Sequence, residues 1–333
     1  MANSALQDLA FAAGAVISLG TSTVLVSRIE RVAERLGFSE ALLGIVAALA
    51  ADAPEITSAI SAIAGHQALV GAGVVLGSCV FNLAALGLGA AVAGFIPLHR
   101  RVILLGGTIS TWVSLAGLGA ATHALGPGAA LGAAVIVLAG YILVSGTAHS
   151  GLTWIPKRSR AWLVSAVTEE EEELSEVIRP DPGGAADGAI AGLALLIVIG
   201  ASILMERAAS SIGHRLGISE IVVGALILAG VTSIPNAVAS TYLARKGRGA
   251  AALSTASNSN NFNIVIGLLL PAVIVGLGAR SHQSILVAAW CLAMTVLTMG
   301  VAYHAGGFGR RAGLLTVASY AVFVAAVVAV GNG

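Results

Sequence analysis

The sequence predicts an all-α, polytopic membrane protein with ten transmembrane helices, arranged as two five-helix repeats that are inverted relative to each other. Composition, ten apolar segments and an internal repeat support this fold class. Hydrophobic residues make up 57% of the 333 residues and charged residues only 10%, whereas a water-soluble domain carries about 25% charged residues. The same numbers exclude a disordered chain, because disorder requires low hydrophobicity and high charge. The 42 glycines suit close helix contacts in lipid.

Each apolar segment is long enough, at about 20 residues, to cross the hydrocarbon core as a helix. The segments lack the polar and apolar alternation of a membrane β-barrel. The ten predicted spans cover residues 5–26, 40–65, 69–96, 102–123, 128–150, 187–206, 219–244, 250–278, 283–304 and 312–331.

The distribution of Lys and Arg predicts the orientation in the membrane. Of the 17 Lys and Arg residues, 14 lie in the odd-numbered connections and 3 in the even-numbered ones. Positively charged loops stay in the cytoplasm. We therefore expect a multi-pass protein of the cell (plasma) membrane, with both termini outside and the central loop in the cytoplasm. The start of the chain lacks the positive region of a cleaved signal peptide and is interpreted as a retained span.

The longest connection, residues 151–186, is predicted to be a cytoplasmic linker between a first repeat (1–150) and a second repeat (187–333). It contains five consecutive glutamates, from Glu169 to Glu173. One interpretation is a regulatory Ca²⁺ site, and the other is a solvated loop with helical tendency. Clustered like charge favours the solvated loop.

An internal repeat relates the two halves. Residues 35–40 (RLGFSE) recur as residues 215–220 (RLGISE), and two further blocks within 39–83 and 219–264 match in register. Pro54 corresponds to Pro235, and Asn82 corresponds to Asn263, with a proline-to-asparagine spacing of 28 in both halves. Because each half holds an odd number of spans, the second copy is inverted, as in many transporters whose site lies at the repeat interface.

The two prolines lie in the middle of predicted spans, where proline removes a backbone donor and breaks a helix. A broken helix exposes carbonyl oxygens that can bind a cation where they line a cavity. Either proline alone fits a simple packing kink. Two prolines at matching positions, both beside polar residues, favour broken helices at an ion site.

Asp52 and Glu55 are the strongest functional signal. They lie three residues apart, on one face of a helix, inside an otherwise apolar span. A carboxylate inside a membrane is costly and marks a functional site by default. A structural ion pair lacks a partner, because no Lys or Arg falls in the core of any predicted span. We predict that both carboxylates bind a cation or a proton.

Hydroxyl and amide side chains at matching positions of the two repeats surround this acidic pair. Hard cations such as Na⁺ and Ca²⁺ take oxygen ligands from carboxylates, amides and hydroxyls. The alternative role, hydrogen bonding between helices, is less favoured because the set is symmetric around the acids. The predicted ligands are Asp52, Glu55, Ser78, Asn82, Thr232, Ser233, Asn236, Ser259 and Asn263. Gly73 and Gly77 form a GxxxG pair that predicts close helix packing.

Other chemistry is not indicated. The chain has no P-loop, HExxH or GxSxG motif, so we expect neither an enzyme nor a cofactor. The two cysteines lie in apolar segments, which argues against a disulfide framework. A net charge of +1 gives no indication of nucleic-acid binding. The expected partners are membrane lipid and inorganic cations. The sequence does not predict the oligomeric state, and a monomer is compatible with it.

The repeats resemble those of the cation/Ca²⁺ exchanger superfamily, specifically the prokaryotic Na⁺/Ca²⁺ exchangers. The pattern of that family is GTSLPE followed by GSNIFN in each half. Here residues 50–55 read AADAPE and 77–82 read GSCVFN, while 231–236 read VTSIPN and 258–263 read NSNNFN. The resemblance implies ion ligands at the matching positions Glu55, Ser78, Asn82, Thr232, Ser233 and Ser259.

The chain departs from that pattern at the ion site. The second glutamate of the family is Asn236 here, the acidic or amide position at the end of the last block is Asn263, and Asp52 replaces a serine. Both carboxylates therefore lie in the first repeat, with amides opposite. Their combined charge of −2 matches one divalent ion, and repulsion between them favours retention of a proton.

The resemblance implies a secondary active antiporter that exports Ca²⁺ by alternating access in exchange for Na⁺ or H⁺. Two alternatives stay open. One is a cation/H⁺ or Na⁺/H⁺ exchanger of altered selectivity. The other is a non-transporting membrane sensor on the same scaffold, because a fold does not dictate a function.

Overall fold

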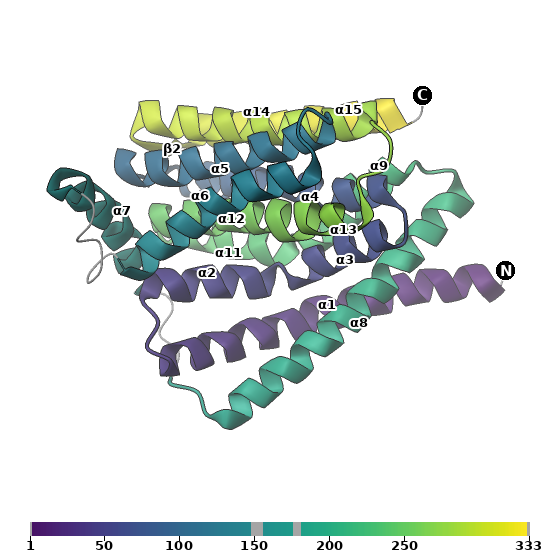
Figure 1. Cartoon of the computed structure of the whole chain (residues 1–333), viewed down its shortest axis with the longest axis horizontal. Helices are drawn as coiled ribbons and strands as arrows, with labels where there is room; N and C mark the ends of the chain where they lie inside the picture. Colours follow the sequence, from purple (N-terminus) through teal and green to yellow (C-terminus); the bar gives the residue numbers. More distant parts are fainter. Residues whose placement is uncertain (1, 148–155, 176–180, 332–333) are drawn as a thin grey trace.

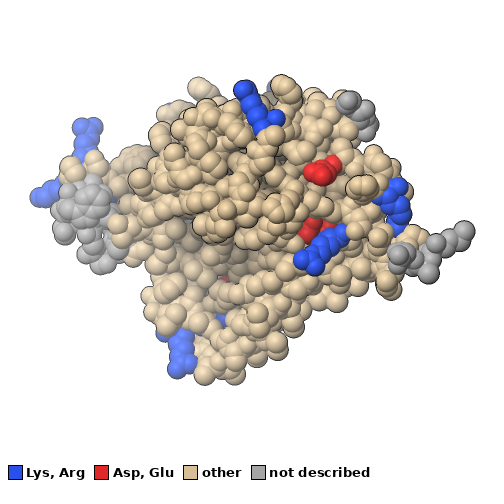
Figure 2. All heavy atoms as spheres, turned by 45° about the vertical axis from the view of Figure 1, so that its right-hand side comes forward, with Lys and Arg blue, Asp and Glu red and all other residues tan. Residues whose placement is uncertain are grey.

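A computed structural model describes residues 2–147, 156–175 and 181–331 as a bundle of helices (Figure 1). Helix α4 (Ala68–Ala93) forms the centre of the bundle, since 89% of its most apolar stretch is buried, against 22% for the outer helices α1 and α15. On the face shown in Figure 2, charged side chains are few and most of the surface is uncharged. Such a surface suits helices that contact lipid.

Eight helices are long and apolar enough to cross a membrane, and two bent helix pairs bring the described part of the chain to ten spans if each pair counts as one. This count agrees with the predicted fold class. Helices α1 and α8 extend beyond the predicted spans 5–26 and 187–206. The eight single helices are α1 (Ala2–Arg35), α4, α5 (Arg100–Ala121), α6 (Pro127–Thr147), α8 (Ala185–Leu216), α12 (Gly249–Phe262) continued by η2 (Asn263–Leu269) and α13 (Leu270–Val275), α14 (His282–Ala305) and α15 (Arg310–Gly331).

The two broken spans occur where the prolines predict them. Helices α2 (Glu40–Ala51) and α3 (Ala53–Ala64) meet at 50°, with Pro54 in the first turn of α3. In the second repeat, α9 (Glu220–Val222), the π-helical segment η1 (Val223–Leu228) and α10 (Ala229–Thr232) meet α11 (Ile234–Arg245) at 52°, with Pro235 in its first turn. Proline is tolerated there because the first N–H groups of a helix have no intrahelical partner.

Glycines let the central helix approach the second repeat closely. A Cβ atom at Gly77 would lie 2.5 Å from the carbonyl oxygen of Ala225, and one at Gly73 would lie 2.8 Å from the nitrogen of the same residue. Only glycine fits at such a distance. The close packing predicted from the GxxxG pair is therefore confirmed, and it holds α4 directly against η1.

Helices α1 and α8 form a separate pair along one edge of the bundle, beside the bent pair α2–α3 (Figure 1). Where they cross, the hydroxyls of Ser18 and Ser202 share a buried hydrogen bond of 2.7 Å. At one end of the pair, Arg28 forms an ion pair of 2.8 Å with Asp187. The two helices can thus move together as one unit.

A short antiparallel ribbon adds β structure that the sequence did not predict. Strand β1 (Phe95–Pro97) pairs with β2 (Gly307–Gly309), with Ile96 opposite Phe308. The ribbon ties the α4–α5 connection to the α14–α15 connection.

The predicted linker contains a helix, α7 (Lys157–Ser175), in agreement with its expected helical tendency, but one side of this helix is buried instead of solvated. Ala166 and Val167 are buried, and a carboxylate oxygen of Glu173 accepts a hydrogen bond of 3.0 Å from the backbone N–H of Ala251. Ala251 lies in the first turn of α12, whose free N–H groups favour a negative charge. The apolar residues of α7 pack against the bundle despite the run of glutamates. As a result, α7 lies against the first turn of α12. A regulatory Ca²⁺ site in this run stays a prediction.

The contact of Glu173 with α12 predicts a pH-dependent docking of α7. Burial raises the pKa of the Glu173 carboxyl above its ordinary value, and the N–H groups at the start of α12 offset this only in part. A raised pKa means that the docked helix favours the protonated acid, so docking is strongest at low pH and weakens as the pH rises through the raised pKa. Hydrogen exchange of residues 157–175, corrected for intrinsic rates, measures this.

Glu173→Gln keeps the acceptor but cannot ionise, so its protection should not depend on pH. Glu220→Gln, which removes an exposed acid outside α7, serves as the control and should show the pH dependence of the unmodified chain. An unchanged pH dependence in Glu173→Gln would contradict this role.

Candidate ion-binding site

The break between α2 and α3 places two carboxylates inside the bundle. Asp52 is the residue at the break, and Glu55 is the third residue of α3, both with 0% exposure. The unpaired N–H groups of a helix's first turn favour negative charge. The break therefore orients the acidic pair and partly compensates its charge.

The matching break in the second repeat faces the acidic pair. The amide nitrogen Nδ2 of Asn236 donates to Oδ1 of Asp52 at 2.7 Å. The hydroxyl of Ser233 donates a short hydrogen bond to Oε1 of Glu55. The two broken helices thus meet through their functional residues.

Helix α12 and segment η2 supply the second set of donors. Ser259 donates to Oδ1 of Asp52 at 2.6 Å, and its oxygen accepts from Nδ2 of Asn236 and of Asn82, each at 3.0 Å. Asn263, the first residue of η2, donates from Nδ2 to Oε2 of Glu55 at 2.5 Å. Ser259 is therefore the central hydroxyl of the network.

Direct hydrogen bonds connect seven of the nine predicted ligands, namely Asp52, Glu55, Asn82, Ser233, Asn236, Ser259 and Asn263. Ser78 is fully buried one turn before Asn82 on α4. Thr232 is also buried, but its hydroxyl donates to the Leu228 carbonyl of its own helix at 2.9 Å. The structure does not bring the Thr232 hydroxyl into the network.

Four of the nine residues keep a buried oxygen without a hydrogen-bond partner among the described residues. These are Oδ2 of Asp52, Oγ of Ser78, Oδ1 of Asn82 and Oδ1 of Asn263. Buried polar atoms are nearly always satisfied, so such a group needs an explanation. All four are oxygens, which is the ligand chemistry of hard cations.

The charge of the acidic pair has no basic counterpart in the described part of the chain. The ion pairs found there involve Asp8, Glu169 and Asp187, and none includes Asp52 or Glu55. No three His, Cys, Asp or Glu side chains gather there in a group suited to a resident metal. An uncompensated buried charge is strongly destabilising. In this structure, hydroxyl and amide donors stabilise the two carboxyl groups instead of a basic side chain.

Two further buried polar residues, Asn260 and Glu206, lie outside the predicted set. Asn260 accepts from Asn82 at 3.1 Å and donates to the Cys79 carbonyl at 3.1 Å, so it locks α12 to α4 beside the site. Asn260 lies in a polar run, residues 257–263, that indicates a buried polar segment. The sequence does not indicate which residues of this run face α4. Glu206 is the last residue of the predicted span 187–206. Because α8 continues to Leu216, Glu206 lies well inside the helix.

Comparison with known proteins establishes the family. The family model for "Sodium/calcium exchanger protein" matches residues 8–149 and 188–329, one match on each repeat. The chain belongs to this family. The predicted resemblance and the two-repeat organisation are confirmed.

Two curated relatives match part of the chain. Sodium/potassium/calcium exchanger 4 of Mus musculus is 31% identical over 134 residues, which is 37% of this chain and 21% of that protein. Sodium/potassium/calcium exchanger 2 of Gallus gallus is 47% identical over 70 residues, which is 21% of this chain and 11% of that protein. The matched regions span about a fifth or less of these relatives.

Two solved structures have the same fold. The sodium-calcium exchanger NCX_Mj, soaked with Na⁺ and Sr²⁺, matches with a TM-score of 0.59 and 22% identity over 97% of this chain and 98% of that chain. Native YfkE matches with a TM-score of 0.63 and 15% identity over 98% and 96%. At these identities the likeness concerns the fold alone. It confirms the predicted all-α membrane architecture.

The two kinds of hydroxyl in the site predict different effects of their removal. Ser259→Ala should lower the free energy of unfolding by about 1–3 kcal/mol, because it removes three buried hydrogen bonds, one to Asp52 and one from each amide of Asn82 and Asn236. Ser78→Ala removes a hydroxyl without a partner and should leave the cation-free stability unchanged. Both should reduce the stabilisation that Ca²⁺ gives, since ligand binding to the folded state raises stability.

Thermal unfolding of the detergent-purified protein, with and without Ca²⁺, measures both effects. If Ser78→Ala destabilised the cation-free protein as much as Ser259→Ala does, Ser78 would have a structural role instead.

Proposed function

We propose that this chain is a secondary active cation antiporter that moves Ca²⁺ across the membrane in exchange for Na⁺ or H⁺. One observation carries the proposal. Two buried carboxylates without a basic partner lie among orphaned buried oxygens, where the two broken helices meet. Membership of the sodium/calcium exchanger family supports the same conclusion.

In this proposal, Asp52 and Glu55 supply the charge that attracts the cation. Neutral oxygens of Ser78, Asn82, Thr232, Ser233, Asn236, Ser259 and Asn263 complete the shell. The two amides that now donate to the carboxylates turn their Oδ1 atoms toward the ion, and the two hydroxyls rotate their protons away. The same side chains therefore stabilise the carboxylates without a cation and ligate the cation once it is bound.

Coupling follows from the charge of the site. An empty site carries a charge of −2 when both acids are ionised, and moving it past apolar helix surfaces is costly. A bound cation or proton removes part of that charge. The protein therefore switches readily between its inward-open and outward-open states only when the site holds a cation or a proton. This requirement couples the two ion movements and prevents uncoupled transport.

Alternating access is assigned to the pair α1–α8, which lies at the edge of the bundle beside the bent helices (Figure 1). Asp52, Glu55, Ser233, Ser259 and Asn263 have 0% exposure, so the site is closed to both sides in this structure. Sliding of the α1–α8 unit opens one side at a time. With the termini outside and α7 in the cytoplasm, Ca²⁺ export would carry the ion from the α7 side of the bundle to the side of the termini.

Uptake of ⁴⁵Ca²⁺ into proteoliposomes tests the function. An outward Na⁺ gradient and an outward H⁺ gradient are applied separately, each with and without K⁺, because the matched relatives are named sodium/potassium/calcium exchangers. Uptake with Na⁺ alone assigns Na⁺/Ca²⁺ exchange, and uptake with H⁺ alone assigns H⁺ coupling. A requirement for K⁺ would add a third ion to the cycle. Absence of uptake with every gradient would overturn Ca²⁺ exchange and favour another cation or a sensor.

Removal of one carboxylate should abolish exchange. Glu55→Gln keeps the size of the side chain but halves the charge of the site, so we expect ⁴⁵Ca²⁺ uptake to fall to background. The matched control is Glu220→Gln, which removes an acid from an exposed position and should transport normally. Persistent flux in Glu55→Gln would show that the site lies elsewhere.

A further inference from the structure

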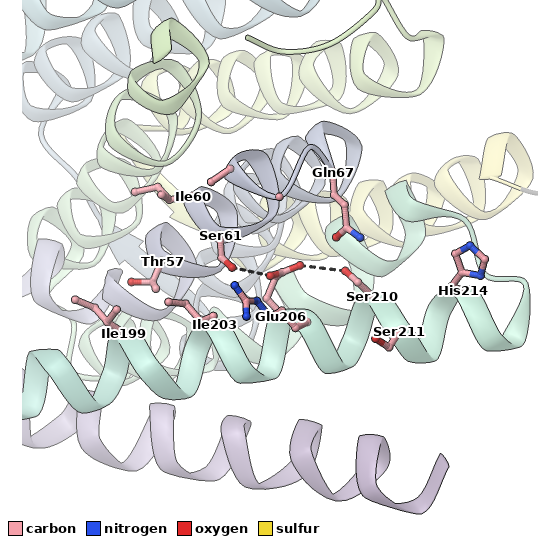
Figure 3. A pocket seen from close by; sticks show the side chains of 13 residues that line it. Thr57, Ile60, Ser61, Gln67, Ile199, Ile203, Glu206, Ser210, Ser211 and His214 are labelled. Carbon is pink, nitrogen blue, oxygen red and sulfur yellow. Dashed lines mark hydrogen bonds between the residues drawn. The ribbon is translucent and has the colours of Figure 1, made fainter. Parts of the chain in front are cut away.

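A third carboxylate inside the helix bundle is not used by the proposed site. Glu206 of α8 is only 2% exposed and faces α3. The hydroxyl of Ser61 donates to Oε2 at 2.8 Å, and the hydroxyl of Ser210 donates to Oε1 at 3.1 Å (Figure 3). Glu206 makes no ion pair with a described residue. An ionisable residue in a transmembrane helix is a functional candidate by default.

This carboxylate lines a cavity of about 910 Å³ between α3 and α8, called here the Glu206 cavity. Gln67 and His214 lie at the ends of the two helices, and Thr57 lies furthest along α3 toward the break at Asp52 (Figure 3). Polar side chains therefore extend from the end of the bundle toward the acidic pair. Between them the lining is mostly apolar, with Ile60, Ile199 and Ile203, and it also includes the basic side chain of Arg207 beside Glu206.

The cavity offers hard-cation chemistry at its middle. Glu206 supplies a carboxylate, and Ser61 and Ser210 supply hydroxyl oxygens that hold it in position. Carboxylates and hydroxyls ligate Na⁺ and Ca²⁺. A single carboxylate with neutral oxygens, in a cavity whose lining also includes Arg207, would bind a cation only weakly.

The second repeat does not duplicate this arrangement. A cavity between the equivalent helix α11 and α4 has a volume of about 750 Å³; its lining, like that of the Glu206 cavity, includes basic residues, but it has no acid. In an inverted repeat, α3 and α11 end on opposite sides of the membrane. The acid is therefore present on one side only, which by the predicted orientation is the outer side.

We propose that Glu206, Ser61 and Ser210 form a low-affinity outer site for hard cations, on the path by which the exchanged cation reaches Asp52 and Glu55. This inference rests on the proposed function. A merely structural Glu206, which only fastened α8 to α3, would change the maximal rate at both faces. An outer cation site changes the apparent affinity at one face.

Transport in oriented membrane vesicles separates these roles. In right-side-out vesicles, Glu206→Gln should raise the apparent KM for Ca²⁺ at least about fivefold, which at 1.4 kcal/mol per factor of ten is about 1 kcal/mol. The maximal rate should stay within about twofold, since the central site is intact. In inside-out vesicles, the KM for Ca²⁺ should be unchanged. Glu220→Gln controls for a general loss of negative surface charge at the same end.

Two results would overturn the outer site while leaving the proposed function in place. One is an unchanged KM at both faces, and the other is a lowered maximal rate at both faces with unchanged KM. If Glu206→Gln did not fold, the double variant Ser61→Ala/Ser210→Ala keeps the acid but removes both hydroxyls, and should raise the outer KM in the same direction.

A binding measurement distinguishes failure of this inference from failure of the proposed function. Equilibrium ⁴⁵Ca²⁺ binding to purified Glu55→Gln should retain a weak component, and adding Glu206→Gln should remove it. If the unmodified chain transported no cation, exchange would be wrong, yet loss of that weak component would still support a cation site at Glu206. Equal binding by the single and double variants would overturn it.

Discussion

The structure depends on one constraint, the burial of two carboxylates in an apolar bundle without a Lys or Arg to pair with them. Asp52 and Glu55 are fully buried, so any charge they carry must be balanced by nearby dipoles and, in the proposed function, by a bound cation. The broken helices, the proline at each break and the glycines that press α4 against η1 all serve this burial. Each brings hydroxyl and amide groups to a distance at which they donate to carboxylate oxygens. Without that shell the acidic pair would have to be neutralised or the helices separated.

The two repeats contribute different groups to the site, and this difference follows from the same constraint. The first repeat provides both acids, and the second provides Ser233, Asn236, Ser259 and Asn263 as donors. An acid at position 236 would repel Asp52, whereas the amide donates to it at 2.7 Å. The amide also presents an oxygen when it turns. In the proposed function, the same side chains would donate to the carboxylates of the empty site and ligate the cation of the loaded site, while the second repeat contributes no charge.

Much of this architecture could be predicted from the sequence because its causes are local. The apolar segments predicted the ten spans, and the match of Pro54 with Pro235 predicted the two breaks. The acidic pair and the polar residues at matching repeat positions predicted seven of the residues that the hydrogen-bond network connects. Three features depend on tertiary contacts and could not be read in this way. Glu173 docks α7 through one backbone N–H of another helix, Thr232 turns its hydroxyl to its own helix, and Glu206 is enclosed only because α8 runs on and packs against α3.

The central claim is that the orphaned oxygens around Asp52 and Glu55 hold the transported cation. X-ray diffraction from crystals soaked in Sr²⁺ tests it most directly, because the anomalous signal of Sr²⁺ locates the ion without reference to side-chain geometry. The account predicts a peak between Asp52 and Glu55, at about 2.3–2.6 Å or slightly more from their oxygens and from those of the surrounding hydroxyl and amide side chains. A saturating soak that left this position empty, or a single strong peak elsewhere in the bundle, would contradict it.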